Sequence, residues 1–212
     1  MSTALLNPRH AASARASWIV AGGMGLLAAV VLLSRWLAAD VGDTLTRNTV
    51  RLSLAWYAVA LLSVMRLSPA DWSATTAKGH WARWCWTWAL ACFWVHLAMA
   101  FHYYHHWSHA DAFERTRRVS GLGEGLYISY LFTLLWTIDV LWWWIAPQGY
   151  RARSAWIDRL LHAFMLFIVF NSMVVFETGP IRWAGLAMFV LLTLACTAAR
   201  RPSRAPSPKS AT

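Results

Sequence analysis

The chain has 212 residues, of which 58% are hydrophobic and only 13% are charged, against roughly 25% charged residues in an ordinary soluble domain. Its mean hydropathy is +0.42, and it contains 16 Trp. This composition excludes a disordered chain and a soluble globular domain, because so apolar a surface needs lipid to cover it. The net charge is +10, and the basic residues lie between and beyond the apolar stretches. This placement indicates contact with lipid headgroups, and we expect no nucleic acid as a partner.

Six apolar segments are each close to the roughly 20 residues that a membrane-spanning helix needs. The sequence therefore predicts an all-α fold, a polytopic transmembrane helix bundle with a six-helix transmembrane domain over residues 17–199. The predicted spans are 17–38, 49–67, 84–105, 123–146, 157–177 and 181–199.

The first segment is also a candidate for a cleaved signal peptide, because Arg9 and Arg15 precede it. Its apolar run from Trp18 to Leu33 is longer than the hydrophobic core of a typical signal peptide, and a basic residue, Arg35, follows it closely. We therefore expect a retained first helix rather than a cleaved leader.

Lysine and arginine predict the orientation, because cytoplasmic loops carry an excess of both. With the N-terminus inside, 12 of them fall on the cytoplasmic side and 7 on the outer side. We expect a multi-pass protein of the cell inner membrane with residues 1–16 as a cytoplasmic N-terminal tail and a cytoplasmic C-terminus. Residues 200–212 are basic and rich in Pro, Ser and Ala, which predicts a disordered tail.

Tryptophan is typical of the boundary between membrane and water. Most of the Trp residues fall near the predicted cytoplasmic ends of the spans, and a smaller group falls near the outer ends. We interpret both groups as interfacial belts. The cytoplasmic belt comprises Trp72, Trp81, Trp84, Trp86, Trp88, Trp142, Trp143, Trp144 and Trp156.

The third segment leads into the densest histidine cluster of the chain. His102, His105, His106 and His109 follow one another without an intervening Gly or Pro, so the third helix is expected to continue through them. At about 100° per residue the four side chains then project from one stripe about 100° wide.

Imidazole is a common ligand of Zn, Cu and Fe, and two His four residues apart on a helix can bind one ion. His102 with His106, and His105 with His109, have that spacing, while Glu124 opens the next span as a possible further ligand. The sequence predicts a transition-metal site at the outer (periplasmic) face. An interfacial stripe of polar aromatic side chains and a pH-sensing cluster remain as alternatives.

The run His102-Tyr-Tyr-His105-His106 resembles one histidine box of the membrane fatty acid desaturases and hydroxylases, which hold two irons. The resemblance covers five residues. Those families use several boxes and about eight ligands, and no second box occurs here, so we do not extend their activity to this chain.

Among the polar side chains inside the predicted spans, we single out His96, Asp139, His162 and Asn171. Such groups face the interior of a bundle. Asp139 and His162 come out at similar depths, which predicts a hydrogen-bonded or ionic pair, with Arg159 as a competing partner for Asp139. We favour a clamp between helices over a proton path. Haem b held between His96 and His162 is a further, weaker alternative.

The leading functional hypothesis is therefore an inner-membrane protein with a histidine-rich site for a transition metal, used for redox chemistry or metal handling. The alternatives are a non-enzymatic scaffold or subunit of a membrane complex, and a small proton-linked transporter. The phosphate-binding, dinucleotide-binding, zincin and serine-hydrolase motifs are absent, so whether the protein is an enzyme stays open.

Overall fold

A computed structural model describes the backbone of residues 8–73 and 76–199 and the side chains of residues 17–73 and 76–198. This part of the chain is helical, with no strands. The predicted tail 200–212 lies outside the described residues, and α1 begins at Pro8, inside the predicted N-terminal tail. The elements are α1 (Pro8–Leu37), α2 (Val41–Val64), a short 3-10 turn (Asp71–Ser73), α3 (Ala77–Tyr104), α4 (His109–Ser120), α5 (Gly125–Ile145), α6 (Pro147–Arg151), α7 (Ala155–Phe170), a π-helical turn (Asn171–Val175) and α8 (Gly179–Ala199).

Five stretches among the described residues are long and apolar enough to cross a membrane, so this part of the chain is all-helical with five candidate membrane-spanning helices. They lie in α1, in α3, in α5, in α7 with its π-helical turn, and in α8. The second predicted span corresponds to α2, which has 24 residues but does not reach the same apolarity. The polar groups at its start, among them Asp43, Arg47 and Arg51, lower its hydropathy.

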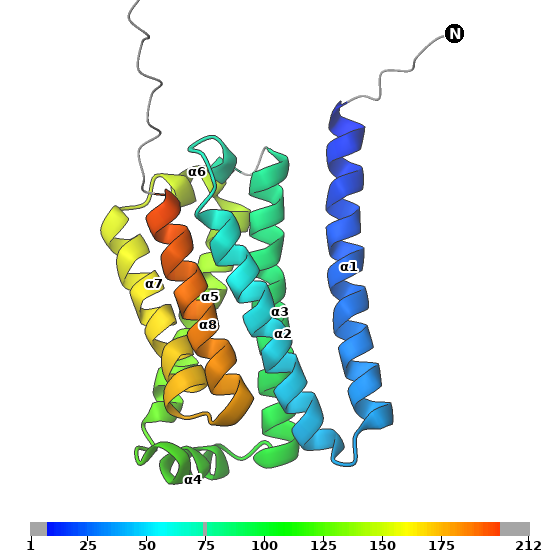
Figure 1. Ribbon diagram of the computed structural model, residues 1–212, viewed down its shortest axis with the longest axis vertical. Coiled ribbons are helices and arrows are strands. Elements are labelled where there is room, and N and C mark those ends of the chain that lie inside the picture. The colour runs from blue at the N-terminus through cyan, green and yellow to red at the C-terminus, as the bar shows by residue number, and fades with distance from the viewer. Residues whose placement is uncertain (1–7, 74–75, 200–212) are drawn as a thin grey trace, which may run out of the picture.

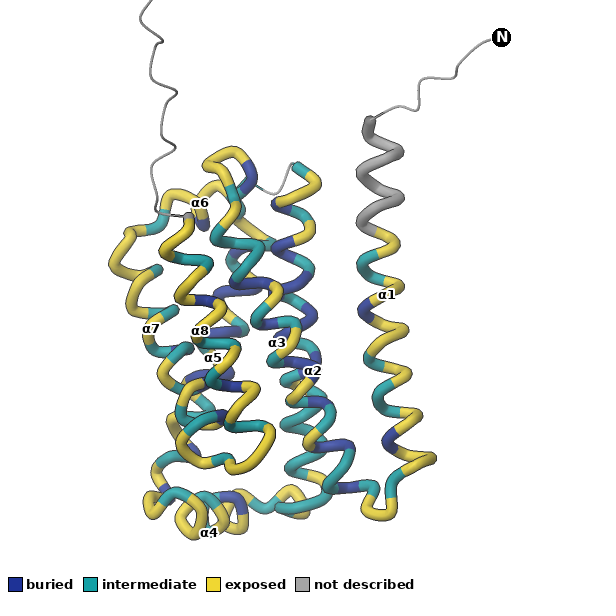
Figure 2. The backbone as a smooth tube through the Cα atoms, viewed as in Figure 1, coloured by how far each residue is buried: buried dark blue, intermediate teal, exposed yellow. Residues whose placement is uncertain are grey.

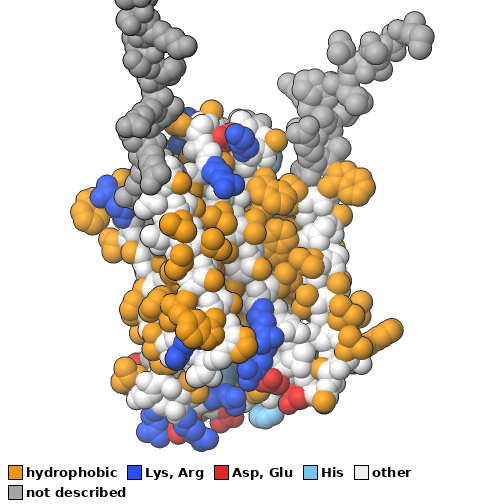
Figure 3. Space-filling view, in the orientation of Figure 1, with side chains coloured by type: hydrophobic (Ala, Val, Ile, Leu, Met, Phe, Trp, Pro, Cys, Tyr) orange, Lys and Arg blue, Asp and Glu red, His pale blue; other side chains and the backbone are white. Residues whose placement is uncertain are grey.

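The long helices run up and down beside one another (Figure 1). The beginning of α1, the short helix α6 and the end of α8 lie at one end of the molecule, while α4 and the turn between α1 and α2 lie at the other. Helix α4 runs across the bundle instead of along it. Helix α1 stands to one side, and most of its described surface is exposed (Figure 2). On the face in Figure 3, hydrophobic side chains cover the middle and charged ones lie toward the two ends.

Helices α2 and α3 form the closest pair in the bundle because small side chains line their contact. Ala82, Cys85, Ala89 and Cys92 of α3 are each 0% exposed, and their spacing of three or four residues places them on one face of the helix. The Ser53 hydroxyl of α2 donates to the Ala89 carbonyl at 2.7 Å. Small residues that let two backbones approach are the usual solution for helices packed in lipid.

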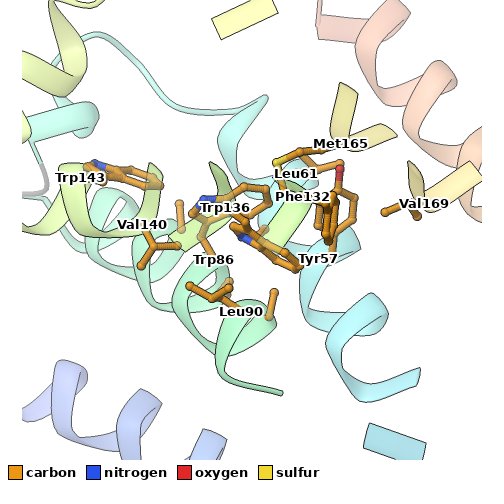
Figure 4. Close-up of a cluster of buried hydrophobic side chains, with 14 of the residues drawn as sticks. Tyr57, Leu61, Trp86, Leu90, Phe132, Trp136, Val140, Trp143, Met165 and Val169 are labelled. Atoms are coloured by element: carbon orange, nitrogen blue, oxygen red, sulfur yellow. The ribbon is translucent and has the colours of Figure 1, made fainter. Parts of the chain in front are cut away.

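The core between these helices and α5 is aromatic (Figure 4). Tyr57 of α2 is 0% exposed. Its ring lies 5.4 Å from Trp86 and 5.6 Å from Trp136, centroid to centroid. Trp86 and Trp143, which the sequence placed in an interfacial belt, are 3% and 1% exposed. The belt interpretation is therefore wrong for these two residues, because their rings fill the bundle instead of facing headgroups.

Candidate functional site

The expected continuous helix through the histidine cluster is wrong. Helix α3 ends at Tyr104, and α4 begins at His109. Between them, His106 and Trp107 have φ angles of 46° and 60°, in the left-handed region that non-glycine residues seldom occupy. The Trp107 N–H closes this turn on the Phe101 carbonyl at 3.0 Å. The Ser108 hydroxyl then caps α4 by accepting from the Asp111 N–H, so the chain turns without Gly or Pro.

Because the helix is broken between α3 and α4, the predicted metal ligands lie in different surroundings. The ring of His102 lies edge-on to Tyr103, with 4.7 Å between centroids, and His106 is exposed in the turn. His109 Nδ1 lies 2.9 Å from the Tyr130 hydroxyl of α5. Glu124 is exposed just before α5 and makes no capping hydrogen bond.

His105 packs against the Phe101 ring, and its Nδ1 is buried without a hydrogen-bond partner among the described residues. Burial, followed by the charge of Arg115, lowers the pKa of this imidazole. Nowhere in the part of the chain that the structure describes do three or more His, Cys, Asp or Glu side chains gather in a way that could hold a metal ion. The transition-metal site therefore stays an untested prediction without geometric support.

A polar network occupies the same end of the molecule instead. Asp43 of α2 pairs with Arg47 at 2.8 Å and accepts a hydrogen bond from the Tyr104 hydroxyl at 2.7 Å. The Arg115 guanidinium of α4 lies 4.3 Å above the Tyr104 ring. Hydrogen bonds from Arg47 and Tyr104 lower the pKa of Asp43. This network joins α2, α3 and α4.

Three of the predicted intramembrane polar residues, His96, His162 and Asn171, bond to backbone carbonyls. His96 Nδ1 lies 2.9 Å from the Thr46 carbonyl of α2, which ties α3 to α2. The Asn171 amide donates to the Phe167 carbonyl one turn earlier, at 2.7 Å, at the start of the π-helical turn. Haem between His96 and His162 is not tested by these contacts and stays a prediction.

Asp139 is the centre of the most strongly bonded polar cluster. Its carboxylate is 2% exposed and accepts from the Trp86 indole N–H at 2.8 Å. It also accepts from the Tyr150 hydroxyl at 3.1 Å and from the Arg153 guanidinium at 2.5 Å. These donors come from α3, from α6 and from the connection between α6 and α7. A single carboxylate therefore joins three other parts of the chain to α5.

The expected pair of Asp139 with His162 is wrong. His162 Nδ1 bonds the Asp158 carbonyl at 2.9 Å, one turn earlier in α7. Trp86 contacts both residues, since its N–H bonds Asp139 and its ring stacks on His162 with 6.1 Å between centroids. Arg159, the predicted competitor, lies over the Trp156 ring instead.

Sequence reasoning missed Arg153, the cation that Asp139 pairs with. Its side chain is 4% exposed and forks between Asp139 and Asp158. Its guanidinium lies 3.9 Å above the Tyr150 ring. Burial, and then the Asp139 carboxylate, raise the pKa of the Tyr150 hydroxyl, which keeps it a hydrogen-bond donor. The depth of Asp139 was the available signal, because a buried carboxylate requires a cation nearby.

Three cavities open beside these groups. A groove of about 560 Å³ between α3 and α5 is lined by aromatic residues, including Trp94, Phe101 and Trp107. A second groove of about 470 Å³ lies between α5 and α7, and a pocket of about 300 Å³ lies next to α6. Arg153 lines both of the latter two. The two grooves are almost wholly apolar, whereas the pocket beside α6 is mixed.

Comparison with models of protein families, with curated proteins and with solved structures finds no match to this chain. The five-residue resemblance to a histidine box therefore gains no wider support. Any functional inference has to come from the arrangement of the chain's own side chains.

Proposed function

We propose that this protein is a non-enzymatic module of a cell inner membrane, which works by binding other membrane components along its lateral surfaces. The observation that carries the proposal is the burial and internal pairing of the polar cluster around Asp139. Asp139 and Arg153 are 2% and 4% exposed at their side chains and already bonded to each other, so the two charges are compensated within the protein and neither group is free to act on a substrate.

The open surfaces support the same proposal. The two larger cavities face sideways and are lined by apolar and aromatic residues such as Trp94, Trp107 and Leu160. Leu160 is 64% exposed and Trp107 is 66% exposed. Surfaces of this kind bind lipid or the apolar face of another membrane protein, and they offer few groups for catalysis.

We also propose that both termini are cytoplasmic. The support is the distribution of Lys and Arg, of which 12 fall on the side of the termini and 7 on the other side. That bias is the usual determinant of orientation in the membrane. With this orientation α6 and the pocket beside it face the cytoplasm, and α4 lies at the outer face.

The test is the composition of the protein purified in a mild detergent from cells that express it at its native level. We expect an assembly larger than the 24.0 kDa chain in its micelle, containing another membrane protein or retained lipid, and no stoichiometric transition metal.

One bound metal ion per chain that is lost in His106→Ala and kept in the control variant His80→Ala would contradict the proposal and restore the metal hypothesis. A monomeric chain that retains neither lipid nor partner would also contradict it.

A further inference from the structure

The two cavities that share Arg153 lie one after the other along α7. The pocket beside α6 contacts Ala155 and Asp158 in the first turn of α7. The groove between α5 and α7 contacts Ile157 and then continues to Phe164. Polar surroundings at the membrane face are thus followed by apolar surroundings deeper in the bilayer.

The groove has the depth of one leaflet. On α5 its lining runs from Trp142 to Leu131, positions eleven residues apart, which corresponds to a rise of about 16 Å at 1.5 Å per residue. Half of a hydrocarbon core of about 30 Å is close to this length. Apart from Asp139 and Arg153 at its inner end, its walls are apolar: Leu131, Leu135, Ile138, Ile157, Leu160 and Leu161.

The charges at the pocket leave a surplus of positive charge. Arg153 is occupied by Asp139 and Asp158. Arg151, which lines the same pocket, is exposed and takes part in no ion pair among the described residues. Of the charged side chains that line the pocket, Arg151 and Arg153 are positive and Asp158 is negative. A phosphate group would complement the unpaired guanidinium of Arg151.

We infer that an anionic glycerophospholipid of the cytoplasmic leaflet binds here, with its phosphate at Arg151 and one acyl chain in the groove between α5 and α7. This names one membrane component for the proposed module and so rests on the proposed function. Three features fit this occupant: a mixed polar pocket followed by an apolar groove, a groove as long as one leaflet is deep, and the unpaired guanidinium of Arg151. A second membrane helix would need a wider apolar face and would leave Arg151 unpaired.

The test measures retained lipid by native mass spectrometry of the whole chain released from nanodiscs. Nanodiscs of mixed phosphatidylglycerol and phosphatidylcholine should give a chain that keeps phosphatidylglycerol preferentially. Arg151→Gln is expected to reduce that retention about fivefold, the effect of one basic side chain on an anionic lipid. Arg66→Gln, an exposed arginine of the same face that lines neither cavity, should change it little.

A second variant fills the groove without touching a charge. Leu135→Trp, at a half-buried position in the groove, should lower the retention of phosphatidylglycerol. Leu194→Trp, on the exposed surface of α8, should leave it unchanged. Thermal melting of each variant checks that it is folded.

Equal retention of the two lipids, or equal retention by Arg151→Gln and Arg66→Gln, would overturn the inference. If the larger assembly persists in such a result, the lipid site alone fails and the proposed module stands. If the assembly is also lost and a metal ion is found, both fail.

Discussion

The ion pair of Asp139 with Arg153 should dominate the stability of the bundle, and Asp139→Asn tests this directly. The asparagine side chain can still accept from Trp86 and Tyr150, but it leaves the Arg153 guanidinium with a single carboxylate partner, Asp158. Removing one member of a buried ion pair costs about 3–5 kcal/mol. Because Asp158 remains, and its side chain is 44% exposed, we expect the lower end, about 3 kcal/mol. That is roughly a 150-fold change in the unfolding equilibrium.

The assay is equilibrium unfolding in mixed micelles, followed by the fluorescence of the 16 Trp residues. Asp43→Asn is the matched control, since the Asp43–Arg47 pair is 38% and 53% exposed and should contribute about 1 kcal/mol or less. In a double-mutant cycle, Arg153→Met combined with Asp139→Asn should cost less than the sum of the single changes by about 2 kcal/mol.

Additive effects in that cycle, or a loss of unfolding free energy below about 0.5 kcal/mol for Asp139→Asn, would refute the conclusion that the Asp139–Arg153 pair stabilises the bundle. The replacement of both residues by apolar ones offers a further check. Asp139→Leu with Arg153→Met leaves the Trp86 N–H and the Tyr150 hydroxyl without their acceptor, so it should cost more stability than Asp139→Asn with Arg153→Met, in which an acceptor oxygen remains.

Two further predictions concern single side chains. Tyr57 has a buried hydroxyl without a partner among the described residues, so Tyr57→Phe should be neutral or stabilise the protein by up to about 1 kcal/mol in the same assay; a loss of stability would reveal a partner for the hydroxyl. Asp71 accepts hydrogen bonds from Thr76 and Ser68, which lower its pKa from 3.8 to about 2. Since the folded-state pKa is the lower one, Asp71 contributes stability above about pH 4 that is lost as the pH falls toward 2; Asp71→Asn should remove this part of the acid dependence, and an unchanged acid profile would contradict the assignment.

The positions of the long helices follow closely from the sequence. The predicted spans 123–146 and 181–199 differ by only a few residues from α5 and α8. Segment 49–67 was also predicted to be helical, and α2 covers most of it. The prediction counted this segment as one of six spans, whereas α2 is not among the five stretches of the described residues that are apolar enough to cross a membrane.

The candidate site was far less predictable. Asp139 was correctly identified as a buried polar group, but its partners were not. Arg153 lies beyond the end of α5 in the sequence, and only the short helix α6 brings it back to the carboxylate. The turn at His106 and Trp107 carries no Gly or Pro, so no local signal marked the end of α3.

The sequence by itself determined that this chain is helical and that several of its helices are long and apolar enough to cross a membrane. In lipid every backbone group must be bonded within its own segment, so length and apolarity are enough to identify the helices. Only the tertiary structure decided which side chains meet. Whether a tryptophan is exposed, as Trp156 is at 67%, or fills the core, as Trp143 does at 1% exposure, depends on the neighbouring helix. Contacts between helices depend on packing over the whole bundle, so the local composition of a segment does not predict them.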